Sequence, residues 1–407
     1  MLKQGHTNPL NIVVIVAALG YFVDIYDLVL FGIVRVPSLQ AIGIAPDQMK
    51  NAGVYLLNMQ MVGMLLGGIV WGMLGDKKGR LSTLFLTILM YSLANIANGF
   101  VQTLDQYAVL RLIAGFGLAG ELGIGITLVS EVMTKETRAW GTSIVSGIGI
   151  LGATLAYLVA ELGWREAYWI GGVLGLLLLG LRVYIHESGM FDKVKESKAK
   201  RGDFFSLFKN WKKFVKYIAS IFIGIPVWFT IGILVFFSND FANALGITGT
   251  VNPGKSIMYH YFGAALGSIV TGYISQKLKS RKKALWIAIT ALSFLCVWYF
   301  NAKGSSPTLF YIIIFMLGLA QGYWAVFITV ASEQFGTNIR STATTTIPNF
   351  VRGATFPMTI WWQYMTEGMG IIQSSMIVGA VVIVLAMIAV FFLEESYGKD
   401  LDYLETD

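Results

Sequence analysis

Twelve long stretches of apolar residues divide this chain, and each is about as long as a helix that crosses a lipid bilayer. A bilayer core of about 30 Å requires about 20 apolar residues in a helix. Because 56% of the residues are hydrophobic and only 13% are charged, the chain has too little polar surface for a soluble protein of this size. The sequence therefore predicts an all-α membrane protein. The expected spans are 10–35, 51–74, 81–101, 105–130, 139–161, 167–186, 215–239, 254–276, 283–301, 307–331, 341–365 and 371–393.

Charged residues between the spans predict the orientation and the domain boundaries. Lys and Arg concentrate in the segments after spans 2, 6 and 8, so we expect those segments, and both termini, on the cytoplasmic side. The formal net charge of +7 is spread over these loops rather than gathered on one face, so we expect no nucleic-acid partner. The expected parts are a first six-helix bundle over 1–186, a cytoplasmic linker over 187–214, a second bundle over 215–393 and a cytoplasmic tail over 394–407.

The two halves of the chain repeat each other. Residues 126–131 read ITLVSE and lead to Arg138, while residues 328–333 read ITVASE and lead to Arg340, half a chain length later. Duplicated apolar halves are typical of secondary transporters. Each copy ends on an acid, which is Glu131 in the first half and Glu333 in the second. The pairs Glu131 with Arg138 and Glu333 with Arg340 are candidate gate elements, and the alternative is that they only anchor helix ends.

A second repeated motif lies at the cytoplasmic end of span 2. Residues 72–80 read GMLGDKKGR, and residues 272–281 are a weaker copy in which Gln276 replaces the acid. An acid such as Asp76 can bind a helix N-terminus or an arginine of the other bundle in one conformation and release it in another. We expect Asp76 and Arg80 to act as a gate, although a turn with orienting charges is the simpler alternative.

These motifs resemble those of a known family. Residues 72–80, the segment 111–121 in span 4 and the sequence GWR at 163–165 are similar to motifs of the major facilitator superfamily. With the twelve spans, the resemblance covers essentially the whole chain. It implies two pseudo-symmetric six-helix bundles that expose a central site to each side of the membrane in turn.

The chain lacks the signatures of an enzyme. There is no glycine loop ending in Lys-Ser/Thr that would hold ATP, and no His/Glu cluster with the spacing of metal ligands. The one cysteine, Cys296, permits no disulfide within the chain. We therefore expect neither catalysis nor a cofactor or metal, and an ion gradient, preferably of protons, as the energy source.

Five ionisable residues deep within the spans mark the candidate coupling site. A charge near the bilayer centre costs about 2.5–3.5 kcal/mol on insertion scales, so such residues persist where they line a cavity or have a partner. They are Asp24, Asp27, Arg111, Glu121 and Arg352.

Asp27 is the favoured proton carrier. With a rise of about 1.5 Å per residue, Asp27 and Arg111 lie at similar depth, about 10 Å below the outer face, and are expected to meet. In proton-coupled sugar porters of the superfamily an aspartate after a tyrosine pairs with the span-4 arginine, and Tyr26 with Asp27 is similar. The doubled acid, with Asp24, and the acid at Glu121 resemble the phosphate and organic-anion branches. Asp24 or Glu121 could carry the proton instead, and a static buried ion pair is a further alternative.

Arg352 is the candidate substrate-binding cation. It lies about 16 Å deep in span 11, near the midplane, and Pro348 is expected to break the helix beside it. No acid lies in the membrane portion of span 11, so a substrate carboxylate, phosphate or sulfate is an available partner. The alternative is an ion pair with Glu121 or with an acid of span 1.

Other polar and aromatic residues at comparable depth could complete a pocket, although each taken singly is more often packing. His260 lies toward the outer end of span 8 and is expected to make a plain hydrogen bond. The pocket candidates are Tyr26, Asn58, Gln60, Trp228, Gln321, Tyr323, Trp324 and Asn349.

The sequence thus favours a proton-coupled symporter that imports a small anionic or zwitterionic solute. One rival is an exporter that exchanges protons for apolar or cationic compounds, and another is a transporter-like receptor that moves nothing. We expect a functional monomer in a bacterial inner membrane, with lipid, protons and one small molecule as its partners.

Overall fold

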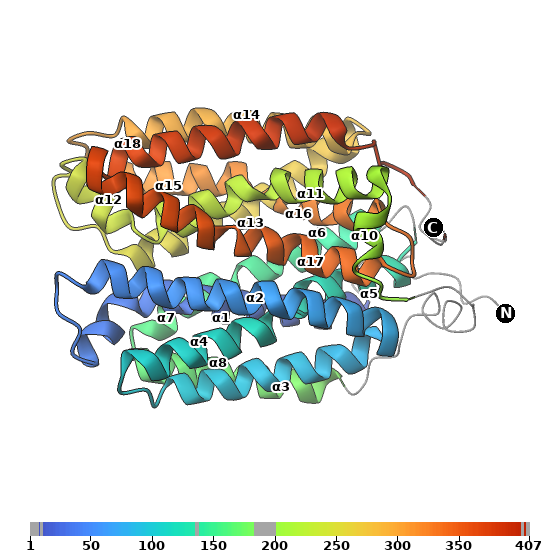
Figure 1. Ribbon diagram of the computed structural model, residues 1–407, viewed down its shortest axis with the longest axis horizontal. Helices are drawn as coiled ribbons and strands as arrows, with labels where there is room; N and C mark the ends of the chain where they lie inside the picture. The colour runs from blue at the N-terminus through green and yellow to red at the C-terminus, as the bar shows by residue number, and fades with distance from the viewer. Residues whose placement is uncertain (1–7, 9–10, 135–137, 183–200, 400–402, 404–407) are drawn as a thin grey trace.

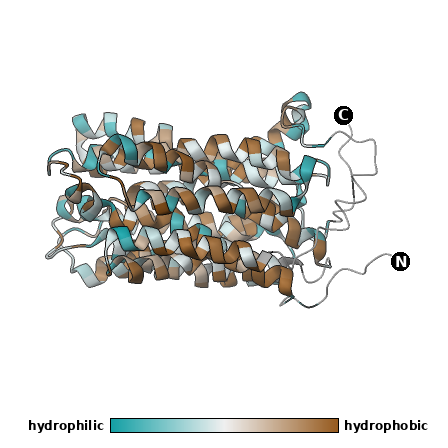
Figure 2. Ribbon diagram, turned by 90° about the horizontal axis from the view of Figure 1, so that it is seen from below, coloured by the Kyte–Doolittle hydropathy of each residue, from teal (hydrophilic) through white to brown (hydrophobic). Residues whose placement is uncertain are grey.

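The protein consists of two groups of long helices that lie side by side. The structure, a computed structural model, describes residues 8, 11–134, 138–182, 201–399 and 403. In Figure 1 most helices of the first half, such as α1 to α4 and α8, form the lower group, and those of the second half form the upper group. Apolar residues run along the middle of the helices and polar residues gather at the two ends, as Figure 2 shows. This distribution fits helices that cross a bilayer.

The helices of the first half follow the first six predicted spans. They are α1 (Ile12–Ala41), α2 (Met49–Lys78), α3 (Arg80–Asn98), α4 (Leu104–Leu118), α5 (Glu121–Val132), α6 (Arg138–Ile150), α7 (Gly152–Ala160) and α8 (Trp164–Arg182). Spans 4 and 5 are each made of two successive helices.

The second half repeats this plan after a short helix in the predicted linker. The elements are α10 (Ser206–Lys209), α11 (Trp211–Phe229), the π-helix η1 (Thr230–Val235), α12 (Ser238–Ala244), α13 (Pro253–Lys277), α14 (Arg281–Phe300), α15 (Pro307–Gln321), α16 (Trp324–Glu333), α17 (Arg340–Gly353) and α18 (Thr355–Phe392). Residues 187–200 of the predicted linker lie outside the described residues.

Each predicted span coincides with a helix or a run of helices in the part of the chain that the structure describes. Nine such helices or runs are long and apolar enough to cross a membrane. The run Arg340–Phe392 contains spans 11 and 12, which are separated at Gly370, where a φ of 79° favours glycine. Spans 6 and 8 correspond to α8 and α13. The predicted twelve-helix architecture is therefore confirmed.

Helix starts follow ordinary capping chemistry. Asn252 precedes Pro253, and its side chain accepts a hydrogen bond from the backbone N–H of Lys255 at 3.1 Å. Ser306 precedes Pro307 in the same way. A polar cap satisfies a free N–H of the first turn, and proline fits there because it has no N–H to lose. These signals place the N-terminal ends of α13 and α15.

The predicted helix break at Pro348 is wrong in position. α17 continues through Pro348 to Gly353, and the break comes at Ala354, before α18. A proline inside a buried helix is tolerated when neighbouring groups satisfy the freed backbone. The missing N–H of Pro348 leaves the carbonyl of Thr344 without its helical donor, yet packing against α2, α5 and α11 carries α17 on to Gly353.

Several helix pairs join the two halves. α2 and α5 of the first half pack against α17, and α6 packs against α13. α1 also contacts α13. The broken helices α4–α5, α15–α16 and α17–α18 all contribute to this interface, so the irregular backbone lies inside the protein, where broken helices are tolerated.

Candidate functional site

A small central cavity lies between the two halves. Its volume is about 20 Å³, which is enough for about one water molecule. Its walls come from α1 and Ile150 on one side and from α11, η1, α13, α15, α16 and α17 on the other. The lining residues are Tyr21, Ile25, Leu28, Ile150, Val227, Trp228, Ile231, Tyr261, Ala264, Gln321, Trp324 and Arg352. The conformation is therefore closed around this cavity.

Arg352 is the cationic residue of the cavity wall, and an acid faces it. The guanidinium Nη2 lies 3.6 Å from a carboxylate oxygen of Asp24 on α1, and both side chains are at least 99% buried. Arg352 Nε and Nη1 have no hydrogen-bond partner among the described residues. The sequence favoured a substrate anion as the partner of Arg352, whereas the structure realises the alternative, an acid of span 1. Arg352 is the residue before Gly353, which ends α17.

Asp27 and Arg111 do not form the predicted pair in this conformation. Arg111 donates instead to the side-chain oxygen of Gln60, and its guanidinium lies 5.3 Å from the ring centre of Phe31. Asp27 is fully buried and faces α8: a Cβ atom on Gly171 would lie 2.5 Å from its carboxylate. Helix α1 therefore directs Asp27 toward α8, while Arg111 is held against α2.

Three of the predicted pocket residues line the cavity. They are Trp228, Gln321 and Trp324. Gln321 is the last residue of α15, and Trp324 begins α16, so the break in span 10 brings both to the cavity. Tyr21 was missed by the sequence analysis, and its hydroxyl accepts a hydrogen bond from Trp324 Nε1 at 3.1 Å. Its spacing of three residues from Asp24 was the available signal.

The other predicted pocket residues bond elsewhere. Their polar groups join helices rather than line the cavity, and Glu121, the first residue of α5, is likewise buried away from its wall. The contacts are Tyr26 hydroxyl to Ala167 carbonyl at 2.7 Å, Tyr323 hydroxyl to Ile223 carbonyl at 3.0 Å, Asn349 amide to Ala119 carbonyl at 2.6 Å, Gln60 amide to Leu28 carbonyl at 3.3 Å, and Thr359 hydroxyl to Asn58 oxygen at 3.0 Å.

Asp76 binds the N-terminus of a helix in the other half. Its carboxylate accepts hydrogen bonds from the backbone N–H of Ser341 at 3.2 Å and from the N–H and hydroxyl of Thr342, both at 2.7 Å. These residues form the first turn of α17, where free N–H groups and the helix dipole favour an anion. The contact expected of Asp76 is formed, and it closes this end of the interface.

Two arginines extend this contact into the cross-half cluster, which comprises Asp76, Arg80, Glu131 and Arg340. Arg80 lies 3.3 Å from Asp76 and 3.0 Å from Glu131. Glu131 also lies 3.3 Å from Arg340 of the other half. The predicted partner of Arg340 was Glu333, and that prediction is wrong because α17 starts opposite α2 and α5. Arg138 begins α6, and its side chain lies outside the described residues.

Glu333 belongs to a different arrangement, the tail cluster. Arg281, from the weaker motif copy, donates to both oxygens of Glu333 at 3.1 and 3.3 Å. Ser396, in the segment after α18, donates its hydroxyl to Glu333 at 2.8 Å. The hydroxyl of Tyr397 donates to Gln276 at 3.1 Å. The tail cluster thus comprises Gln276, Arg281, Glu333, Ser396 and Tyr397, all from the second half.

A third contact closes the opposite end of the interface, and the sequence analysis missed it. Arg35 of α1 is 4% exposed and donates to the carbonyl of Phe236 at 3.3 Å and to the side chain of Asn239 at 3.1 Å. Its guanidinium also lies 3.8 Å from Asp240 and 4.5 Å from the ring centre of Phe237. An arginine at the end of an apolar span was the available signal.

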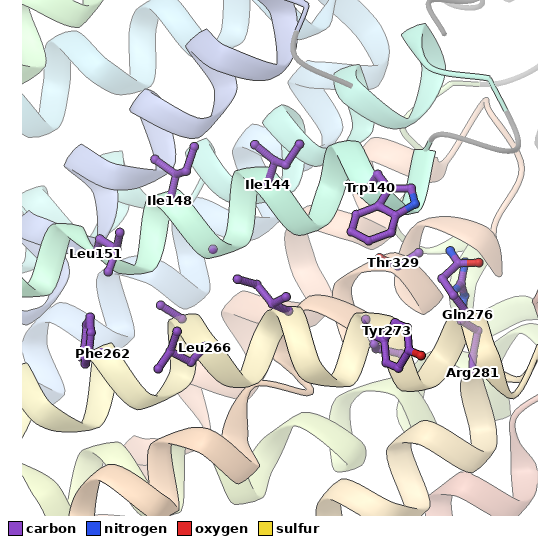
Figure 3. Close-up of a pocket in the computed structure, with 15 residues that line it drawn as sticks. Trp140, Ile144, Ile148, Leu151, Phe262, Leu266, Tyr273, Gln276, Arg281 and Thr329 are labelled. Atoms are coloured by element: carbon purple, nitrogen blue, oxygen red, sulfur yellow. The ribbon is translucent and has the colours of Figure 1, made fainter. Parts of the chain in front are cut away.

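A larger groove lies at the side of the molecule, and it differs from the central cavity in chemistry. It has a volume of about 440 Å³ and runs between α6 and α13, with Trp140, Ile144 and Ile148 facing Phe262, Leu266 and Tyr273 (Figure 3). Its walls are apolar and exposed, with polar groups only at the end near Arg281 and Gln276. A polar solute needs convergent polar groups, so the central cavity is the better candidate.

Comparisons with known proteins agree with this architecture. A family model described as the Major Facilitator Superfamily matches residues 17–358. The niacin transporter NiaP of Acinetobacter baylyi is 24% identical, and the alignment covers 95% of this chain and 94% of that protein. The benzoate transport protein of the same organism is also 24% identical, over 84% of this chain and 80% of its own length.

A solved structure shares the fold. It is the proton:xylose symporter XylE bound to 6-bromo-6-deoxy-D-glucose, with a TM-score of 0.76 and 14% identity. The match covers 96% of this chain and 97% of that one. The two-bundle arrangement of the helices is therefore shared over nearly the whole length.

Proposed function

The chain belongs to the major facilitator superfamily and is a multi-pass membrane transporter, and on that basis we propose that it imports a small organic acid together with protons through the central cavity. Bacterial relatives support an inner-membrane location. The loop charges support cytoplasmic termini. Both walls of the cavity come from one chain, which supports a monomer as the working unit.

The pair formed by Arg352, on the cavity wall, with Asp24 behind it carries this proposal. A guanidinium recognises a carboxylate through two parallel hydrogen bonds, and Arg352 has two nitrogens without a partner among the described residues. The rest of the wall is aromatic and aliphatic, with Trp228 and Trp324 among its residues. This surface suits an apolar or aromatic body bearing one carboxylate, and two of the relatives are named for benzoate and niacin.

Competition for Arg352 would couple the proton to the solute. An unpaired buried charge costs several kcal/mol, so Arg352 requires one negative partner in every closed state. Asp24 supplies it at 3.6 Å when no solute is bound. A proton on Asp24 removes that charge and frees the guanidinium for the solute carboxylate. The closed conformation is then stable in two states. In one, Asp24 pairs with Arg352 and no solute is bound; in the other, Asp24 is protonated and the solute carboxylate pairs with Arg352.

The two ends of the interface would gate this exchange. Opening the outer end requires Arg35 to leave the turn around Asn239, and opening the inner end requires Asp76 to release the N-terminus of α17. Both contacts are closed here, and the cavity between them is too small for an organic acid. The solute therefore enters after the outer contact opens and leaves after the inner one opens.

Ligand binding and flux test the proposal together. Benzoate, nicotinate and their carboxamides are compared by tryptophan fluorescence and thermal shift in the purified protein. We expect the carboxylates to bind more tightly than the carboxamides, and Arg352→Ala to lose this preference by at least tenfold, because a charged hydrogen bond contributes about 1.5–3 kcal/mol. Arg352→Ala that keeps both preference and transport would favour a proton-exchanging exporter of apolar compounds.

A matched pair of variants locates the coupling proton. In proteoliposomes, Asp24→Asn is expected to abolish uptake driven by a pH gradient while sparing solute exchange. The asparagine takes up no proton and has no negative charge that competes with the solute for Arg352. Asp27→Asn is the control, since Asp27 faces α8 rather than Arg352. Uncoupling by Asp27→Asn alone would assign the proton to Asp27, and full driven uptake in both variants would refute proton coupling at this pair.

A further inference from the structure

His260 and Gln321 form a buried pair beside the central cavity. The ring Nε2 of His260 lies 2.7 Å from Gln321 Oε1, and the ring Nδ1 lies 3.3 Å from the carbonyl of Ile314. The side chains are 0% and 3% exposed. The sequence analysis expected only a plain hydrogen bond for His260, but its partner is a residue of the cavity wall.

Close helix packing fixes this pair. A Cβ atom on Gly318 would clash with the carbonyl of His260, and one on Gly322 would clash with the backbone of Gly267. α13 and α15 therefore touch backbone to backbone on both sides of the pair. α15 ends at Gln321, so the glutamine lies at the break in span 10 with its amide next to the cavity.

The hydrogen bond decides which end of the amide is left for the cavity. A glutamine amide has one oxygen that accepts and one NH₂ group that donates. The ring lies closer to the Gln321 oxygen, at 2.7 Å, than to the Ile314 carbonyl, at 3.3 Å, which favours the tautomer with its hydrogen on Nε2. Nε2–H then donates to the Gln321 oxygen and occupies it, and Nδ1, which carries no hydrogen, makes no hydrogen bond to Ile314. The NH₂ group is then the part of the Gln321 amide that is left for the cavity, and the wall of that cavity also carries Arg352. Both groups donate hydrogen bonds, which suits an anion.

We propose that His260 is a positioning residue that holds the Gln321 oxygen away from the central cavity and so presents the Gln321 NH₂ group to a carboxylate bound at Arg352. The inference rests on the proposed function and deepens it. Arg352 supplies the charge, and Gln321 supplies a second donor, so the site prefers a carboxylate over its carboxamide. Without the ring, the Gln321 amide can turn and offer its oxygen to a carboxamide NH₂ group instead.

Two variants separate the two ring nitrogens. The side-chain amide of His260→Gln reaches about as far as Nε2 and keeps a donor for Gln321, whereas that of His260→Asn reaches only about as far as Nδ1 and leaves Gln321 without that donor. Dissociation constants of benzoate and benzamide are measured for each by tryptophan fluorescence, with thermal shift as the check of folding. We expect the benzoate-to-benzamide preference to fall about tenfold in His260→Asn and to be retained in His260→Gln.

The outcomes distinguish this inference from the proposed function. If Arg352→Ala loses the preference while His260→Asn retains it, the positioning role is refuted and the carboxylate site stands. If the unmodified protein binds benzoate and benzamide equally, both fail. Equal losses of preference in His260→Asn and His260→Gln would also refute the positioning role, because only the first loses the donor.

A further variant keeps the test decisive if both histidine variants fail to fold. Gln321→Glu has the same shape, and with one oxygen held by His260 it presents the other oxygen to the cavity. We expect benzoate binding to weaken at least tenfold, through repulsion between two acceptors, while benzamide binding changes little. Undiminished benzoate binding by Gln321→Glu would overturn the inference.

Discussion

The two charge clusters built around Asp76 and Glu333 come from repeated sequences but connect different parts of the molecule. In the cross-half cluster, Asp76 and Glu131 of the first half bind the start of α17 and Arg340 in the second half. In the tail cluster, Glu333 binds Arg281 and Ser396, which both belong to its own half. The cross-half cluster must therefore break when the halves separate, whereas the tail cluster can move together with the second half.

The difference indicates that one repeat copy joins the two halves, whereas the other holds the second half to the segment after α18. The weaker motif copy has Gln276 where the first has Asp76, and an uncharged amide cannot hold a helix N-terminus as a carboxylate does. The segment after α18 contacts Gln276 instead, through the hydroxyl of Tyr397. Glu395 accepts hydrogen bonds from the N–H of Arg281 at 2.9 Å and from the hydroxyl of Ser280 at 2.5 Å, at the start of α14.

The largest expected effect is that of Asp76→Asn. The substitution weakens three hydrogen bonds to α17 and removes the charge near Arg80, so the inner end should open more often. Removing one partner of a buried ion pair costs about 3–5 kcal/mol, and the three hydrogen bonds are weakened as well, so we expect at least about a hundredfold change in the closed-to-open ratio. Gly125→Cys in a Cys296→Ser background provides a reporter thiol, because a Cβ atom on Gly125 meets no atom within 4 Å. Its labelling by a membrane-impermeant reagent should accelerate.

Gln276→Ala is the matched control for that experiment. It changes the equivalent position of the second copy and removes only the acceptor of Tyr397. Labelling of the reporter should stay within about twofold of the parent, an energy change below about 0.5 kcal/mol. Similar acceleration in both variants would contradict the distinction between a cluster that joins the two halves and a cluster that lies within one half.

A smaller contrast is expected between Glu131→Gln and Glu333→Gln. Removing one partner of a buried ion pair costs about 3–5 kcal/mol. For Glu131 that cost falls on the closed state, so reporter labelling should rise with little change in thermal unfolding. For Glu333 it falls on the fold of the second half, so the unfolding temperature should drop without faster labelling. The reverse assignment of these two readouts would contradict the comparison.

The smallest expected effect concerns the edge of the tail cluster. Lys216 Nζ lies 3.0 Å from Glu394, whose side chain is 60% exposed. The hydrogen bond from Lys216 holds the pKa of Glu394 below its usual 4.5. The stabilisation is therefore present above pH 4.5 and is lost as the pH falls through the lower pKa of the folded state. Because the pair is exposed, its contribution should stay below about 1 kcal/mol.

Thermal unfolding of Glu394→Gln against the parent checks this pH dependence. We expect a small loss of stability at pH 7 that disappears in acid, since the protonated glutamate no longer differs in charge from glutamine. A difference that persists unchanged below the folded-state pKa would show that Glu394 acts through packing rather than through its charge.

Much of the fold could be predicted from local sequence because its causes are local. Apolar spans placed the helices, and the Lys and Arg clusters marked which loops share one end. Asp76 was also predictable, because an acid in a glycine-containing loop at a helix end is suited to binding another helix terminus. The position of the break in span 11 was not, since packing against neighbouring helices carries α17 through Pro348.

The partners of the deep charges were predicted less well than the charges themselves. Depth along a helix placed Asp27 and Arg111 at one level, but it does not say which way each side chain faces. Rotation of α1 directs Asp27 to α8 and Asp24 to Arg352. His260 likewise gave no sequence signal for its bond with Gln321, which joins different helices.

The sequence by itself determined that this chain enters a membrane as two related halves with a few buried charges, because hydrophobicity, repeats and loop charge are properties of residues and their order. Only the tertiary structure decided which charges meet. The two clusters begin from similar motifs, yet α17 starts opposite α2 while the tail lies against α14. A buried charge is stabilised by whichever counter-charge the packing brings within about 4 Å, and that choice belongs to the packed fold.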